Sequence, residues 1–132
     1  LLRDLCDAGK TVLVETSGEA DVARVDPRVR TINDLKAPGS GESQRNRWSN
    51  LDHVRATDEI KFVLADRADY EWMRGVVRDR GLAARTPNLL ASTVFGKLAA
   101  RELVAWVLED ALPVRVQLQM HKYIWPPDAT GV

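Results

Sequence analysis

Residues 29–42 read VRTINDLKAPGSGE and hold the strand and the turn around which the rest of the chain is organised. The first half is apolar and β-branched and predicts a strand, whereas the Pro-Gly-Ser-Gly sequence after it predicts a turn. Asp34 and Lys36 stand two positions apart at the junction, so both side chains leave the same face of an extended backbone. With the hydroxyl of Ser40 nearby, this acid and base suit a zwitterion such as an amino acid head group.

Composition restricts the classes of partner. The chain has 132 residues, enough for one domain with a buried core, and it carries 19 basic and 19 acidic residues. Because the charges are balanced and scattered along the sequence, they form no basic cluster that would bind nucleic acid or an anionic membrane. We therefore expect neither as a partner. The longest apolar run, 103–108, is far shorter than the roughly 20 residues of a membrane helix. Cys6 is the single cysteine, which excludes an internal disulfide and fits a reducing cytoplasm.

The alternation of apolar patterns predicts an α/β fold. We expect strands at 11–14, 29–35, 60–64, 88–95 and 114–120, and helices at 1–5, 48–54, 68–80 and 99–112. The first strand is continuously apolar, which indicates burial on both faces. Strands that alternate with helices or long connections indicate parallel strands with right-handed crossovers, in an open sheet or part of a barrel.

Polar side chains follow most of these strands. In a parallel sheet, ligand sites lie at the carboxyl ends of the strands, and those ends meet at one edge. We therefore expect the polar residues there to lie close together, with Glu15, Asp34, Lys36 and His121 converging on one end of the sheet. The residues in question are Glu15, Thr16 and Ser17, then Asp34 and Lys36, then Ser92 and Thr93, and finally Gln119 and His121.

The last expected strand has two interpretations. Between Arg115 and His121 apolar and polar residues alternate strictly, so Gln117, Gln119 and His121 share one face. That face is either the wet side of an edge strand, or a barrel lumen whose amides and imidazole bind the polar edge of a heterocycle.

Lys61 also has more than one interpretation. It is flanked by apolar neighbours in the third strand, and a buried lysine is costly without a partner. It forms an ion pair with Glu59 or Asp34, or provides a cation for a carboxylate or phosphate, or acts as a Schiff-base amine like that of an aldolase.

Taken together, the chain resembles the 7-carboxy-7-deazaguanine synthases, which are radical S-adenosylmethionine enzymes of deazapurine (queuosine) biosynthesis. The resemblance covers nearly the whole chain in order, and the series of motifs is more specific than any one of them. The matching segments are 14–19 (VETSGE), 34–41 (DLKAPGSG), 58–63 (DEIKFV), 69–72 (DYEW) and 114–122 (VRVQLQMHK), together with Asn46, Trp48 and Asn50.

The resemblance implies a fold, a reaction and a set of cofactors. Residues 1–132 would be a single domain, the C-terminal half of a partial TIM-like (radical SAM) barrel, lacking the N-terminal half that binds the cluster. The family converts 6-carboxy-tetrahydropterin to 7-carboxy-7-deazaguanine with loss of ammonia, using S-adenosylmethionine, a four-iron, four-sulfur cluster and magnesium. Its ligands for cluster and magnesium would lie in the absent half, and members are often homodimers.

The resemblance also implies site residues. The Thr16-Ser17-Gly18 turn would belong to the cofactor-binding loop, and Asp34 and Lys36, with Ser40, would hold the methionyl end of S-adenosylmethionine. Further cofactor contacts are implied at Lys61 and Ser92, and the end of the pterin pocket at Gln119 and His121. The chain departs from the family at Thr93, where a proline is expected, and in its cysteine content.

Three functional hypotheses follow. The chain is part of such a synthase and is inactive in radical chemistry by itself, or it is an aldolase-like barrel with Lys61 as the nucleophile, or it is a non-catalytic module that binds a nucleoside or pterin.

Overall fold

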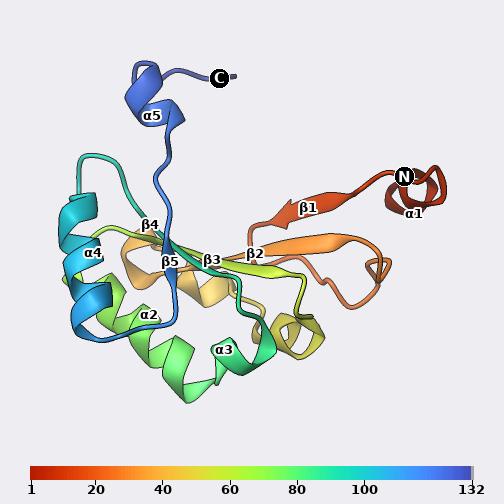
Figure 1. The fold of residues 1–132 in the computed structure, drawn as a ribbon, viewed down its shortest axis with the longest axis horizontal. Coiled ribbons are helices and arrows are strands. Elements are labelled where there is room, and N and C mark those ends of the chain that lie inside the picture. Colours follow the sequence, from red (N-terminus) through yellow and green to blue (C-terminus); the bar gives the residue numbers. More distant parts are fainter. Residues whose placement is uncertain (132) are drawn as a thin grey trace.

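The computed structural model describes residues 1–131, which form a five-stranded sheet with helices (Figure 1). Every strand is parallel to its neighbours, and the order in the sheet, β1-β2-β3-β4-β5, is the order in the chain. This confirms the α/β class with parallel strands. The strands are β1 (Leu13–Thr16), β2 (Arg30–Lys36), β3 (Glu59–Leu64), β4 (Leu89–Thr93) and β5 (Arg115–Val116). The helices are α1 (Leu2–Asp7), α2 (Arg67–Asp79), α3 (Leu82–Arg85), α4 (Ala100–Glu109) and α5 (His121–Ile124), with 3-10 helices η1 (Pro38–Ser40), η2 (Ser43–Arg45) and η3 (Trp48–His53).

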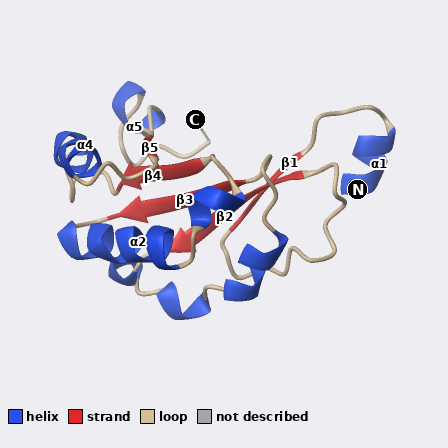
Figure 2. Ribbon diagram, turned by 60° about the horizontal axis from the view of Figure 1, so that its bottom comes forward, coloured by secondary structure: helices blue, strands red, loops and turns tan. Residues whose placement is uncertain are grey.

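The two faces of the sheet have different surroundings. On one face, Leu35 of β2 and Phe62 of β3 belong to the buried core that Met73 of α2 and Leu103 of α4 complete. Figure 2 shows α2 on this side and the C-terminal segment with α5 on the other. We call the other side the open face. By strand alternation and register it carries the side chains of Glu15, Asp34, Lys36, Lys61 and Ser92.

The two outermost strands differ from the sequence expectation. Residues 11–14 were expected to be buried on both faces, but Leu13 is 52% exposed. Within residues 1–131, β1 is an edge strand that pairs only with β2. The expected strand at 114–120 is reduced to the two residues of β5. The amide of Gln117 still donates to the carbonyl of Ala91, and after it the chain leaves the sheet. β4 itself continues to Thr93, two residues beyond Ala91, which is the register partner of Val116.

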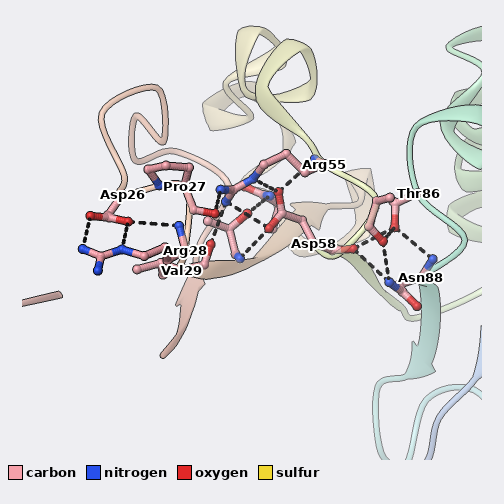
Figure 3. Close-up of polar contacts among 11 residues, drawn as sticks. Asp26, Pro27, Arg28, Val29, Arg55, Asp58, Thr86 and Asn88 are labelled. Carbon is pink, nitrogen blue, oxygen red and sulfur yellow. Dashed lines mark hydrogen bonds and ion pairs between the residues drawn. The ribbon is translucent and has the colours of Figure 1, made fainter. Parts of the chain in front are cut away.

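The buried residue Asp58 connects the amino ends of β2, β3 and β4, through its carboxylate and through its backbone carbonyl (Figure 3). The Asp58 side chain is fully buried, and it accepts hydrogen bonds from the backbone amides of Thr31 and Arg55, both at 2.9 Å. The Arg55 guanidinium adds a third bond, Nε to Oδ2, at 3.0 Å. The side chains of Thr86 and Asn88 donate to the Asp58 carbonyl oxygen at 2.7 and 3.3 Å. These contacts fix the starts of three neighbouring strands relative to one another.

The structure predicts an acid-sensitive stability contribution from Asp58. Burial alone would raise the pKa of this carboxyl, but the hydrogen bonds from Arg55 and from the two amides outweigh it and lower the pKa below 3.8. Because the folded pKa lies below the unfolded one, the contribution is complete above about pH 4 and is lost as the pH falls through the folded pKa. Asp58→Asn should therefore lower the unfolding free energy by about 3 kcal/mol at pH 7. The deficit should shrink when urea denaturation is repeated below pH 4.

The matched control is Asp52→Asn, whose carboxylate is 72% exposed and lies 3.5 Å from Arg85. It should change the unfolding free energy by about 0.5 kcal/mol or less. Equal urea midpoints for the two variants at pH 7 would contradict the role given to Asp58.

Candidate functional site

Four residues selected from the sequence line one cavity on the open face. Lys61 comes from β3, Ser92 from β4, and Gln119 and His121 from the segment that crosses the sheet after β5. The cavity has a volume of about 360 Å³, and Gln117, Leu118 and Met120 complete its lining. We call it the open-face pocket. It presents an ammonium, a hydroxyl, amides and an imidazole, a set that can bind the polar edge of a heterocycle and an acidic group.

The residues 117–121 do not form the strand that the alternation predicted. Leu118 and Met120 were expected to pack against helices, but they are 48% and 67% exposed, and both line the open-face pocket. The segment is an irregular wall that turns into α5 at His121. Neither interpretation of the last strand was therefore right about its backbone, although the polar side chains do line a cavity.

The acid and base on β2 lie next to this pocket. Lys36 Nζ donates to Asp34 Oδ2 at 2.7 Å, and Asp34 is the register partner of Lys61 on β3. The other carboxylate oxygen, Asp34 Oδ1, is buried and has no hydrogen-bond partner within residues 1–131. A buried acceptor without a donor is costly, so this oxygen marks a position where a donor from a ligand would be bound.

Lys61 forms an ion pair, as one sequence interpretation held, but its partner is neither Glu59 nor Asp34. Lys61 Nζ lies 3.0 Å from Glu15 Oε1, across the intervening strand β2. Both side chains leave the open face, and the long lysine side chain spans β2. Glu15 is 56% exposed, and an exposed pair of this kind contributes little to stability. A ligand acid can therefore replace Glu15 at small cost.

Glu15, Asp34 and Lys36 lie on the open face, and His121 lines the pocket there, but their convergence on one end of the sheet stays a prediction. Lys61 is the link, since it pairs with Glu15, faces Asp34 in the sheet register and lines the pocket with His121. Polar side chains thus come from β1, β2, β3, β4 and the segment after β5, with Ile32, Val63 and Leu90 between them on the same face.

The Thr16-Ser17-Gly18 turn packs directly on the end of β2. Gly18 has a φ of +81°, and a Cβ at this position would lie 2.5 Å from the Asp34 carbonyl oxygen. Thr16 Oγ1 accepts a hydrogen bond from the Gly18 amide at 3.3 Å, which closes the turn. Ser17 is exposed beside it. The absence of a Cβ at Gly18 therefore allows this turn to lie close against the Asp34 backbone.

The hydroxyl of Ser40 is used within its own turn. It donates to the Ala37 carbonyl at 2.7 Å and accepts from the Glu42 amide at 3.1 Å. The structure shows no contact from this hydroxyl to Asp34 or Lys36 among residues 1–131. Its turn is held instead by Asp69 of α2, which accepts from the Gly39 amide at 2.7 Å.

Two supporting residues were not identified as such from the sequence. Asn46 holds both backbone groups of Lys36, accepting from its amide at 2.9 Å and donating to its carbonyl at 2.8 Å. Asp69 supports the turn after β2, as described. Both residues belong to the segments that carry the family resemblance. Their contacts could not be predicted from local sequence spacing, because Asn46 is 10 positions from Lys36 and Asp69 is 30 positions from Gly39.

The structure gives no sign of a metal site or a membrane span. Within residues 1–131, no three His, Cys, Asp or Glu side chains are grouped so that they could hold a metal ion. None of the helices described here combines the length and apolar character needed to cross a bilayer.

Comparison with known proteins finds close relatives. No model of a protein family matches the sequence. The chain is 45% identical over its whole length to a 7-carboxy-7-deazaguanine synthase from Chlorobaculum tepidum, covering 61% of that protein. It is 44% identical to the synthase of the same name from Koribacter versatilis, over 97% of this chain and 62% of the relative. A third, from Leptospira interrogans, is 37% identical over 90% of this chain and 50% of its own length. The chain thus spans between half and two thirds of the length of these relatives.

The close approach of Gly18 to β2 can be tested with two alanine substitutions. Gly18→Ala and Gly41→Ala both place a side chain on a backbone with positive φ, at +81° and +74°. Each should cost about 1–2 kcal/mol of unfolding free energy for that reason alone. Gly41 has no atom within 4 Å of the added Cβ, whereas Gly18→Ala meets the Asp34 carbonyl. Thermal and urea denaturation should therefore show a clearly larger loss for Gly18→Ala. Equal losses would refute the close approach.

Proposed function

Because this chain belongs to the 7-carboxy-7-deazaguanine synthase family, we propose that it is part of such a synthase and carries portions of its cofactor and substrate sites. The whole protein would convert 6-carboxy-tetrahydropterin to 7-carboxy-7-deazaguanine with loss of ammonia, as a lyase of the radical S-adenosylmethionine class. The observation that carries this proposal is the unpaired, buried Asp34 Oδ1 beside Lys36, at the margin of a polar pocket on the open face.

We assign the methionyl end of S-adenosylmethionine to Asp34 and Lys36. The ammonium of the methionyl group is a donor that would satisfy Asp34 Oδ1, and its carboxylate would pair with Lys36 Nζ. Both side chains are mostly buried, with 13% and 32% exposure, which strengthens charge interactions relative to bulk water. When bound, S-adenosylmethionine supplies the radical chemistry that begins the ring contraction. Thr16 and Ser17 lie at the neighbouring strand end and would contact the same cofactor, while Ser40 would act through its turn.

We assign the pterin to the open-face pocket. The amide of Gln119 can both donate and accept, and the His121 imidazole can do either, which suits the mixed polar edge of a pterin. Lys61 can exchange Glu15 for the substrate carboxylate, or for the cofactor carboxylate, because both sites meet at β3. Ser92 lies beside Lys61 in the pocket lining and would contact whichever of the two lies over β4.

The residues of this chain do not fit an iron-sulfur cluster or a magnesium ion. There is one cysteine, Cys6, and the described residues contain no grouped set of metal ligands. We therefore propose that the ligands for both lie outside this chain, and we assign no step through them to its residues. The sequential, all-parallel strand order with helices on one face supports membership in a partial barrel.

The aldolase-like alternative has no support from the relatives, which are named as synthases. Lys61 forms its ion pair with Glu15, and no second feature of the pocket indicates a Schiff-base site. A module that only binds pterin or nucleoside is separated from the synthase by the experiments below.

The cofactor assignment predicts a binding defect in two variants. Isothermal titration calorimetry should show that the chain binds S-adenosylmethionine. Asp34→Asn and Lys36→Met should each weaken this binding by about tenfold or more, because each variant loses one charge-assisted hydrogen bond to the ligand. Lys10→Met is the matched control, because Lys10 is exposed and lies before β1. Unchanged affinity in Asp34→Asn, with the fold intact by circular dichroism, would remove the assignment.

Turnover can be tested in a chimera. Residues 1–132 would replace the aligned part of the Chlorobaculum tepidum synthase, and product formation from 6-carboxy-tetrahydropterin would be followed by chromatography. We expect 7-carboxy-7-deazaguanine to form, and His121→Ala to raise the KM for the pterin. A folded chimera that binds both ligands without turnover would support the binding module instead.

A further inference from the structure

A second cavity lies on the helix-covered side, away from the open face. It has a volume of about 640 Å³ and runs between η3 and α2. Trp48 and Trp72 form its apolar walls, with ring centroids 6.3 Å apart and planes tilted by 54°. Glu71, Gly75, Val76, Asp79 and Arg80 complete the lining. We call it the tryptophan groove. None of its residues contributes to the open-face pocket, and the proposal below does not depend on the proposed function.

Gly75 is the unusual residue of this groove. It lies in the interior of α2, where glycine costs about 1 kcal/mol relative to alanine. Nothing in the fold requires it, because its φ is ordinary and an added Cβ would meet only Asp79 Oδ2, at 3.9 Å. The glycine therefore leaves the helix backbone bare at the floor of the groove, which allows a flat group to lie on it.

The charges around the groove select the sign of that group. Glu71 is paired with Arg67 at 3.1 Å, whereas the Asp79 carboxylate has no ion-pair partner among residues 1–131. Asp79 Oδ2 lies 3.9 Å from the position that a Cβ at Gly75 would take, and Asp79 lines the groove together with Trp72. The cation of the groove lining, Arg80, is stacked on Trp48 and forms no ion pair with Asp79. An indole face and a carboxylate together favour an organic cation.

A planar cation is already stacked on one of the two indoles of the groove. The guanidinium of Arg80 stacks on Trp48, with its central carbon 3.9 Å from the ring centroid. Trp72 is half-buried and packs against Trp48 and Phe62, and among residues 1–131 no guanidinium is stacked on its ring. We propose that the tryptophan groove is a binding site for a planar guanidinium cation, which stacks on Trp72 over Gly75 and pairs with Asp79. The same chemistry is offered by a free guanidino compound and by an arginine side chain of a protein.

The probes that test this site differ in charge and planarity. N-acetylarginine amide would be titrated into the chain while the indole NMR signals of Trp48 and Trp72 are followed, assigned from Trp→Phe variants. N-acetylcitrulline amide has the same shape without the charge, and N-acetyllysine amide has the charge without the plane. Arginine should bind at least about fivefold more tightly than either, as expected for a cation–π contact with a charge partner. Equal binding of citrulline, or equal shifts at Trp106 and Trp125, would overturn the proposal.

Two variants separate binding from folding. Gly75→Ala should stabilise α2 and raise the Tm, yet weaken arginine binding about fivefold or more because the methyl group occupies the floor. Asp79→Asn should weaken it similarly, whereas Asp4→Asn, 82% exposed on α1, should leave it unchanged. Normal arginine binding by Gly75→Ala would refute the site. Repeating the titration with an arginine-containing peptide identifies the source, since tighter binding of the peptide indicates a protein partner and equal binding indicates a free guanidino compound.

Discussion

The fold depends on the hydrogen bonds of one buried residue, Asp58, made by its carboxylate and by its backbone carbonyl. Asp58 and its neighbours satisfy backbone and side-chain groups at the amino ends of three adjacent strands. In a parallel sheet, the register that is set where the strands begin holds along their whole length. The relative positions of Asp34, Lys61 and Ser92 are therefore fixed once the starts of β2, β3 and β4 are fixed. The hydrogen bonds around Asp58 thus help to fix the geometry of the candidate site on the open face.

Polar groups at the amino ends of the strands and on the open face differ in how completely they are hydrogen-bonded. At the amino end, the buried Asp58 carboxylate accepts from Arg55 and from two amides. On the open face, Asp34 keeps a buried oxygen without a hydrogen-bond partner among residues 1–131, and Lys61, near the middle of β3, pairs with an exposed glutamate. Incomplete pairing on the open face and fuller pairing at the amino ends of the strands is the pattern expected when stability and binding are divided between them.

Much of the central fold could be predicted from local sequence pattern. The strands at 29–35 and 60–64 and the helices at 68–80 and 99–112 were found within a few residues, because each has a strong apolar period. The strand at 114–120 was wrong in its extent, because alternation describes side chains only, whereas a strand also needs backbone pairing. The pairing with β4 stops at Val116, although β4 itself continues to Thr93. The polar residues of the site were predictable from their places after strands. The partner of Lys61 and the supporting role of Asn46 were not, since they depend on distances between segments far apart in the chain.

The short pairing of β5 divides the molecule into parts of unequal local stability. The ladders that join β2, β3 and β4 each extend over five residue pairs, whereas β5 is joined to β4 by two. Backbone amides in β3 should therefore exchange with solvent only on global unfolding, and those after Gln117 by small local openings. One wall of the open-face pocket can then fluctuate while the strands that carry Asp34 and Lys61 remain in place. Ligand entry would require no disturbance of the core.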